Sequence, residues 1–155
     1  MEIALKPIGV IRTPFKNKPD TPIQGTYAPD ALGTVTLFKK YMTGLKDIDT
    51  FTHIYLIYYF DRAGEIKMVR QTFLDDTPHG LFATRHPCRP NGIGLTIVKL
   101  VKCEGANLIV SGVDMLDRTP LLDIKPYIPR FDNQRHASNG WVGLIKKRKK
   151  PDGRE

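Results

Sequence analysis

The sequence predicts an all-β fold, a single-sheeted β-barrel of short strands with only minor helical turns. Three observations predict it: the apolar segments are β-branched, aromatic or alternate with period two, helix signals are scarce, and 12 prolines and 13 glycines punctuate the chain at short intervals. Closure of such strands into a barrel removes exposed sheet edges, and a β-sandwich is the alternative. The 155 residues are enough for one domain with its own hydrophobic core.

Four segments carry the strand signals. Residues 3–11 are β-branched and interrupted by Pro7, which is typical of an edge or bulged strand. Residues 33–38 alternate with period two, and residues 51–60 are aromatic and β-branched, as in a buried strand. Residues 94–116 contain two apolar runs on either side of a Glu-Gly-Ala turn and are expected to form a hairpin.

The remaining segments are expected to be helical turns, loops and a tail. Residues 41–48 and 65–71 could each form one or two helical turns. We expect the barrel domain to span residues 1–135. A C-terminal segment, residues 136–155, would then dock a short element around Trp141 and end in a solvated basic tail.

Charge and composition indicate the kind of partner and the compartment. The net charge is +8 and the pI about 9.6, which favours a polyanionic partner such as nucleic acid. Two cysteines, Cys88 and Cys103, cannot form a disulfide framework and are typical of the reduced cytoplasm. Neither a signal peptide nor an apolar run of membrane-spanning length is present, so we expect a cytoplasmic protein without a membrane partner.

The first segment whose residues could form a functional site is the long loop at residues 12–25. A long loop inside a compact domain is usually functional or disordered. Gln24 offers a donor and an acceptor on one amide, which suits a purine edge or a carboxylate. The alternative is a solvated glutamine.

The second segment, residues 82–95, is rigid and cationic. Pro87 and Pro90 restrict the backbone, so Arg85 and Arg89 would be presented as pre-organised anion-binding groups. The two glycines at its end permit close approach of a ligand to the backbone. The alternative is a rigid connector with solvent-facing arginines.

The third segment, residues 114–132, is expected to be an acidic turn and loop. Asp114 and Asp117 could accept hydrogen bonds from ribose hydroxyls or an ammonium group. Plain turn chemistry with a surface pair between Asp123 and Lys125 is the alternative.

Standard catalytic motifs are absent from the sequence, and His86 and Cys88 are only a fragment of a metal site, so no metal is expected. The residues alone therefore favour either a nucleic-acid binder or a transferase that works by positioning its reactants. A metal-dependent enzyme is the least favoured interpretation.

Two long motifs carry a family resemblance. "FATRHPCRPNGIGLTIVKL" followed by "MLDRTPLLDIKPYIPRFD", with "PIGVIRTPFK" and "PIQG" before them, resembles the TrmO family (TsaA-like) of tRNA methyltransferases over residues 5–132. The resemblance implies a β-barrel, usually a homodimer, that binds S-adenosylmethionine. It also implies methylation of N6-threonylcarbamoyladenosine at position 37 of tRNA. A non-catalytic RNA-binding β-barrel is the alternative.

The resemblance also implies which residues form the sites. The cofactor pocket would take eleven residues: Ile23, Gln24, Gly25, Asp61, Arg62, Arg85, Leu95, Leu116, Asp117, Arg118 and Thr119. Apart from the resemblance, we expect Arg89, Lys125 and Tyr127 to bind the tRNA. Arg89 lies between two prolines at the crest of its loop, where it would meet a phosphate. The family motif usually has glycine where this chain has Arg118, which would crowd the turn or add a phosphate contact. No catalytic residue is assigned, because methyl transfer depends mainly on alignment.

Overall fold

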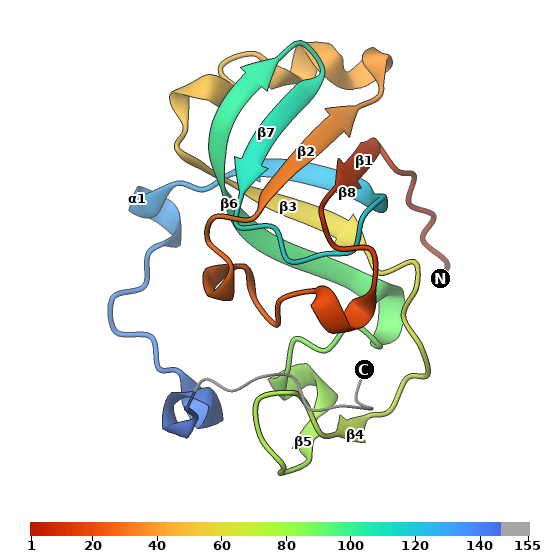
Figure 1. Ribbon diagram of the computed structural model, residues 1–155, viewed down its shortest axis with the longest axis vertical. Helices are drawn as coiled ribbons and strands as arrows, with labels where there is room; N and C mark the ends of the chain where they lie inside the picture. Colours follow the sequence, from red (N-terminus) through yellow and green to blue (C-terminus); the bar gives the residue numbers. More distant parts are fainter. Residues whose placement is uncertain (147–155) are drawn as a thin grey trace.

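A closed barrel of six antiparallel strands forms the centre of the molecule (Figure 1). The computed structural model describes residues 1–146. Around the barrel the strand order is β1-β2-β7-β6-β3-β8. The six strands are β1 (Gly9–Arg12), β2 (Leu32–Leu37), β3 (His53–Tyr59), β6 (Ile93–Glu104), β7 (Asn107–Ser111) and β8 (Thr119–Pro126). The prediction of a single-sheeted barrel is confirmed, and the sandwich alternative is wrong.

Most of the expected strands are present, with shifted ends. Strands β2, β3 and the hairpin β6–β7 lie where the sequence predicts them. The hairpin ends at Ser111 instead of residue 116, because Gly112 has a φ of +89° and turns the chain away from the sheet. Strand β1 begins only at Gly9, and residues 1–7 are exposed.

The expectation of a loop over residues 114–132 is wrong for its central part, because residues 119–126 form strand β8. It closes the barrel by pairing with β1 on one side and β3 on the other. Pro120 and Pro126 lie near its ends, and prolines in a sequence usually indicate a loop. Pro120 faces Val10 of the short strand β1, where the sheet tolerates it.

Helical structure is limited to short turns. The expected turns at residues 41–48 are two 3-10 helices, η3 (Lys39–Leu45) and η4 (Ile48–Thr50). The helical expectation for residues 65–71 is wrong. This segment contains no helix, and within it Val69–Arg70 form β4, which pairs with β5 (His79–Gly80). The other turns are η1 (Lys18–Asp20), η2 (Gly25–Tyr27), η5 (Leu81–Ala83), η6 (Pro90–Gly92), α1 (Pro129–Asp132) and η7 (Gly140–Leu144). None of the helices in residues 1–146 is long and apolar enough to cross a bilayer.

The core consists of the inward-facing side chains of the barrel strands, in which buried and exposed positions alternate. Alternation is clearest in β3 and in the first half of β6, where every second side chain is buried. Ile54 and Leu56 of β3 and Leu121 of the neighbouring strand β8 are fully buried. Burial of apolar surface therefore fixes which face of each strand points inward, and so which polar residues enter the barrel.

The C-terminal segment docks on the β4–β5 ribbon. The Trp141 ring stacks on His79 with 3.7 Å between ring centroids, and its Nε1 donates to the carbonyl oxygen of Ala83 at 2.9 Å. Figure 1 shows the chain running from α1 along the barrel to this ribbon. The basic tail falls largely in residues 147–155, which lie outside the described part of the chain.

Candidate functional site

A partly buried carboxylate, that of Asp114, joins three segments at one end of the barrel. Its Oδ1 accepts hydrogen bonds from the hydroxyls of Thr96 (2.6 Å) and Tyr58 (3.4 Å). Its Oδ2 accepts one from the backbone amide of Gly25 (2.9 Å). Burial raises the pKa of Asp114, whereas the hydrogen bonds from Thr96, Gly25 and Tyr58 oppose that rise. The carboxylate thus ties the loop at residues 12–25 to β3 and β6.

Close backbone packing makes this tie possible. A side chain at Gly25 would place its Cβ 2.2 Å from the carbonyl oxygen of Gly112. A Cβ on Gly94 would lie 2.2 Å from the ring of Tyr58, which packs directly over that glycine. In this structure the open space beside Gly94 is therefore filled by a tyrosine ring. Burial and the neighbouring carboxylate of Asp114 raise the pKa of Tyr58, so its hydroxyl stays protonated.

The two loops singled out in the sequence meet above this carboxylate. Nη1 of Arg85 donates to Oε1 of Gln24 at 2.8 Å, and the Gln24 amide nitrogen donates to the carbonyl oxygen of Ile23. Arg85 is exposed, and Gly25 follows Gln24 directly. The residues assigned to the cofactor from these two loops are thus in contact.

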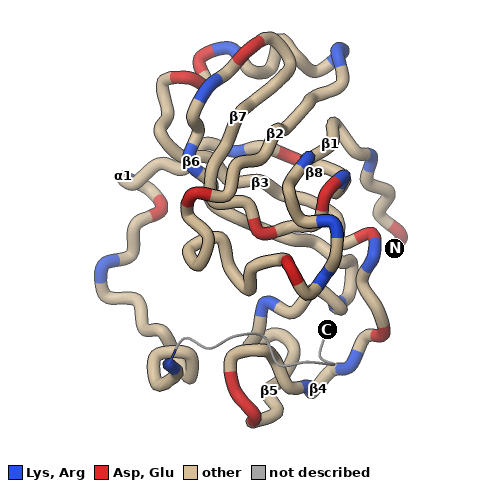
Figure 2. Tube along the Cα trace, viewed as in Figure 1, with Lys and Arg blue, Asp and Glu red and all other residues tan. Residues whose placement is uncertain are grey.

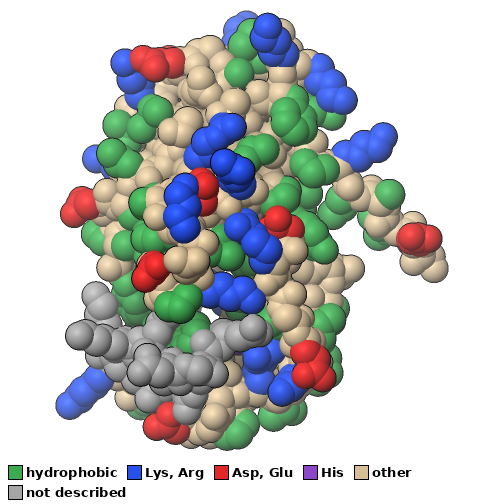
Figure 3. Space-filling model, turned by 45° about the vertical axis from the view of Figure 1, so that its right-hand side comes forward, with side chains coloured by type: hydrophobic (Ala, Val, Ile, Leu, Met, Phe, Trp, Pro, Cys, Tyr) green, Lys and Arg blue, Asp and Glu red, His purple; other side chains and the backbone are tan. Residues whose placement is uncertain are grey.

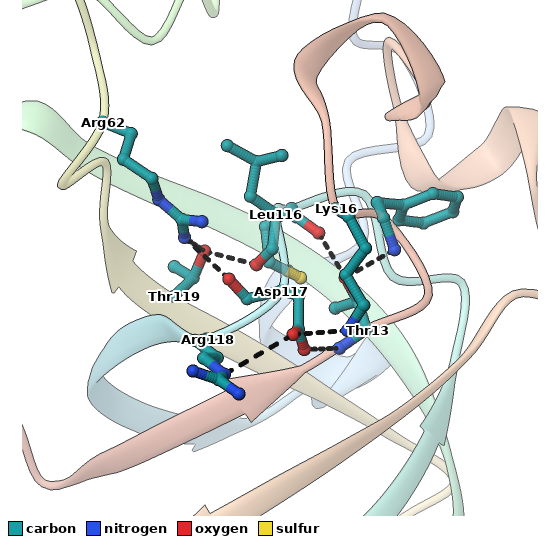
Figure 4. Close-up of polar contacts among 9 residues, drawn as sticks. Thr13, Lys16, Arg62, Leu116, Asp117, Arg118 and Thr119 are labelled. Carbon is teal, nitrogen blue, oxygen red and sulfur yellow. Dashed lines mark hydrogen bonds and ion pairs between the residues drawn. The ribbon is translucent and has the colours of Figure 1, made fainter.

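A second cluster surrounds the turn at residues 116–119 (Figure 4). Asp117 is buried, and its Oδ1 accepts from the backbone amide of Thr13 at 3.0 Å. Its Oδ2 accepts from Nζ of Lys16 at 2.5 Å and lies 3.8 Å from Nε of Arg118. Burial alone would raise the pKa of Asp117, but Lys16, the Thr13 amide and Arg118 together hold it below its ordinary value. Both carboxylate oxygens therefore serve to fix this turn.

Arg62 brings the end of the aromatic strand to the same turn. Its Nη2 donates to the carbonyl oxygen of Asp117 at 2.8 Å and to Oγ1 of Thr119 at 3.3 Å, and its Nε donates to Asp61 at 3.1 Å. The Thr119 hydroxyl in turn donates to the carbonyl oxygen of Leu116 at 2.6 Å. The assigned pair 61–62 and the assigned turn 116–119 are thus joined.

The other assigned residues lie further from these contacts. Leu95 is next to Thr96, but its side chain is on the outer face of β6 and is 56% exposed. Lys125 pairs with Asp123 at 3.1 Å, and Tyr127 packs edge-on against Tyr55. Lys125 and Tyr127 are at the opposite end of β8 from Thr119.

Arg89 is folded back onto its own loop. Its Nη1 donates to the carbonyl oxygen of Thr84 at 2.8 Å and to that of His86 at 3.4 Å. These bonds hold the rigid loop together, and a phosphate contact of Arg89 stays a prediction.

His86 and Cys88 are packed inside the loop. They are 6% and 1% exposed, and the Cys88 amide donates to Nδ1 of His86 at 3.1 Å. Within residues 1–146 no group of three or more His, Cys, Asp or Glu side chains is placed to hold a metal ion. Within the described part of the chain, no set of ligands supports the alternative of a metal-dependent enzyme.

Sequence reasoning missed the polar residues that support both clusters. Tyr58 continues the inward phase of Ile54 and Leu56 in β3, and this phase is the signal that could have identified it. Thr96 carries no such signal, because its outward-facing neighbours in β6 are more apolar than the inward-facing positions. Thr13 and Lys16 carry no such signal, because only the folded chain brings their loop to Asp117.

Residues 10–133 match the family model of the tRNA-methyltransferase O N-terminal domain. A relative from Pyrococcus abyssi, named a probable S-adenosyl-L-methionine-binding protein, is 48% identical over 90% of this chain and 76% of its own length. The human protein named tRNA (adenine(37)-N6)-methyltransferase is 33% identical over 85% of this chain. This chain spans only 32% of the human protein.

The architecture is also similar to solved structures. A crystal structure of TrmO from Pseudomonas aeruginosa superposes with a TM-score of 0.81 at 36% identity. The match covers 95% of this chain and 66% of that one, so the solved protein contains further residues outside the shared barrel.

Proposed function

The chain belongs to the tRNA-methyltransferase O family, and we propose that it transfers a methyl group from S-adenosylmethionine to N6 of N6-threonylcarbamoyladenosine at position 37 of tRNA. One observation carries the proposal: the family match spans residues 10–133, and within it Arg85 contacts Gln24 while Arg62 contacts the 116–119 turn. The names of the relatives support both the cofactor and the adenine at position 37. A tRNA substrate and the presence of only two cysteines in the chain agree with a cytoplasmic enzyme.

The residues present suit such a cofactor. Arg85 supplies an exposed guanidinium for a carboxylate, Gln24 an amide, and Leu95 an exposed apolar side chain. The backbone of the 116–119 turn would complete the pocket. Arg118 takes part there only through its main chain, since the family usually has glycine at this position.

The reaction needs alignment more than a nucleophilic residue. S-adenosylmethionine would supply an activated methyl group: its carbon–sulfur bond would break as the carbon–nitrogen bond formed, S-adenosylhomocysteine would leave, and the N6 proton would pass to solvent. The chain's own groups hold the reactants. Asp114 fixes Gly25 and its loop, and Asp117 and Arg62 fix the turn at 116–119. Rigid positioning of two reactants contributes about 7–11 kcal/mol to lowering a barrier in favourable cases.

Methyl transfer can be tested directly. Calorimetry should show binding of S-adenosylmethionine. Incubation with tRNA that carries N6-threonylcarbamoyladenosine should give the N6-methylated nucleoside in mass spectrometry, together with S-adenosylhomocysteine. The same tRNA without the threonylcarbamoyl group is the control. RNA binding without cofactor binding would instead establish the non-catalytic RNA-binding barrel.

We also propose that the protein is a homodimer formed through the outer face of β3 and β6. Tyr59, Ile93, Leu95 and Ile97 lie on this face and are 42–56% exposed. Paired positions across the two strands, such as Tyr59 and Ile93, make the apolar surface continuous. A second copy of the chain would cover it, and Leu95 would then place the cofactor pocket beside the interface.

Ile97→Lys should therefore convert a dimer to a folded monomer in sedimentation experiments, because a charge buried in an apolar interface is strongly unfavourable. Met42→Lys, at an exposed apolar residue of η3, is the control and should keep the wild-type state. A wild-type protein that sediments as a monomer at micromolar concentration would contradict the dimer.

A further inference from the structure

A basic groove lies on the outer wall of the barrel beside the 116–119 turn. Its volume is about 530 Å³, and it is lined by Arg12, Lys16 and Arg118 together with residues at the start of β2 and Ile109 of β7. Arg12 ends β1 and Arg118 directly precedes β8, and these two strands pair with each other. Figure 2 shows several basic positions around β1 and β8, and Figure 3 shows Lys and Arg side chains gathered near the centre of this side.

The groove has more positive charge than its own carboxylate neutralises. Lys16 and Arg118 share one carboxylate, that of Asp117. Arg12 forms no ion pair with any of the described residues, and its guanidinium donates to Oγ1 of Thr36 at 3.4 Å. Three cations and one carboxylate leave a net charge of +2 in the groove. A groove with this excess of positive charge attracts an anion.

The backbone of Arg118 gives an independent indication of function. Its φ is +63°, in the left-handed region that side chains other than Gly, Asn and Asp rarely adopt. Its side chain is 82% exposed and reaches Asp117 only at 3.8 Å, so it contributes little to packing. In Figure 4 its guanidinium lies on the opposite side of the turn from Arg62. Strain at a residue that does little for the fold is typical of a functional position.

We infer that this groove binds a phosphate group of the RNA backbone, next to the cofactor site. The inference rests on the proposed tRNA substrate. S-adenosylmethionine has a net positive charge, because its sulfonium and ammonium groups outweigh its carboxylate, and a groove of net charge +2 therefore disfavours it. A polyanion is attracted instead, and the guanidinium groups of Arg12 and Arg118 can each donate two hydrogen bonds to phosphate oxygens.

The experiment measures binding of a synthetic anticodon stem-loop RNA to the full chain over a range of salt concentrations. Arg118→Gly should weaken binding about two- to fivefold near physiological salt, as expected for an exposed ion pair. It should also reduce the log–log salt slope by about 0.7–0.9, the value for one phosphate contact. Arg12→Gln should act in the same direction. Arg118→Lys keeps the charge and should keep the slope, and Lys46→Gln, on the η3–η4 segment, is the control.

The melting temperature of Arg118→Gly provides a second readout. Because glycine adopts this φ without strain, the variant should melt no lower than the wild type. A wild-type salt slope in both Arg118→Gly and Arg12→Gln would overturn the inference. So would a variant that binds RNA normally but binds S-adenosylmethionine more weakly, since the groove would then hold the cofactor. Failure of the wild type to bind S-adenosylmethionine would overturn the proposed function instead, and leave the groove as an RNA site.

Discussion

Replacing Asp114 with alanine is expected to lower stability and cofactor affinity together. The substitution removes the acceptor of three groups, the Gly25 amide and the hydroxyls of Thr96 and Tyr58. The hydroxyls of Thr96 and Tyr58 remain bonded to each other, so two donors, the Gly25 amide and one hydroxyl, lose their partner. Each costs about 1–3 kcal/mol, and relaxation recovers part of it, so we expect a total of about 2–4 kcal/mol. For a domain of this size the melting temperature should fall by about 4–16 °C.

The effect on the cofactor follows from the loop that Asp114 holds. Without the bond to Gly25, the segment that carries Ile23 and Gln24 is no longer fixed to the barrel, and binding must order it. We expect the dissociation constant for S-adenosylmethionine to rise at least about tenfold in calorimetry. Both measurements are made below the melting temperature of the variant, so that unfolding does not contribute.

Asp114→Asn separates the charge from the hydrogen bonds. The amide can keep its oxygen toward Gly25 and donate from its nitrogen to the hydroxyls of Thr96 and Tyr58, both of which can accept. It also removes a partly buried charge whose desolvation raises the pKa of Asp114. Asn should therefore restore most of the affinity that Ala loses, and Asp30→Asn, at an exposed position, should have no effect. Equal losses in Ala and Asn would mean that the charge itself binds the cofactor, and the positioning role would be wrong.

The sequence predicts the barrel more completely than it predicts the site. Period-two alternation in the sequence identifies the faces of β2. Strands β3 and β6 were expected from their apolar and β-branched residues, and only their burial in the closed barrel alternates. Strand β8 was not expected, because prolines are more frequent in loops than in strands and two of them lie near its ends. Residues 65–71 have helical composition, but Val69 and Arg70 pair with β5 and the segment contains no helix. Tertiary pairing overrides local preference in both cases.

At the site, the sequence identifies residue types and leaves their tasks open. Arg85 and Arg89 lie four positions apart in one rigid loop, yet Arg85 reaches across to Gln24 whereas Arg89 binds its own loop carbonyls. Nothing in their spacing distinguishes these roles, because both depend on where the loop at residues 12–25 packs. Asp114 and Asp117 have similar sequence surroundings, and burial is the largest influence on the pKa of each. At Asp114 burial prevails, whereas at Asp117 Lys16, the Thr13 amide and Arg118 together outweigh it. The pKa shifts have opposite directions for this reason.

Gly94→Ala is expected to be among the most destabilising single substitutions in the barrel. The added Cβ would lie 2.2 Å from one ring carbon of Tyr58 and 2.6 Å from another. The ring cannot move aside easily, since Tyr58 is 3% exposed and its hydroxyl is bound to Thr96 at 2.9 Å and to Asp114. Overpacking of this kind typically costs about 1–3 kcal/mol, and displacement of the Tyr58 hydroxyl adds the loss of a buried hydrogen bond. Thermal and denaturant unfolding should show the loss, and cofactor affinity should fall with it because Asp114 loses a partner.

A second substitution tests whether the clash with Tyr58 is the cause. Tyr58→Leu alone leaves a cavity and removes a hydrogen bond, so it should also destabilise. If the ring is what the new methyl group meets, the double variant Gly94→Ala, Tyr58→Leu should be more stable than the sum of the two single effects allows, by about 0.5–3 kcal/mol. Gly44→Ala is the matched control, because no other atom lies within 4 Å of its added Cβ. Additive effects of the two substitutions would show that Gly94 is required for a reason other than the ring of Tyr58, such as the backbone conformation of β6 itself.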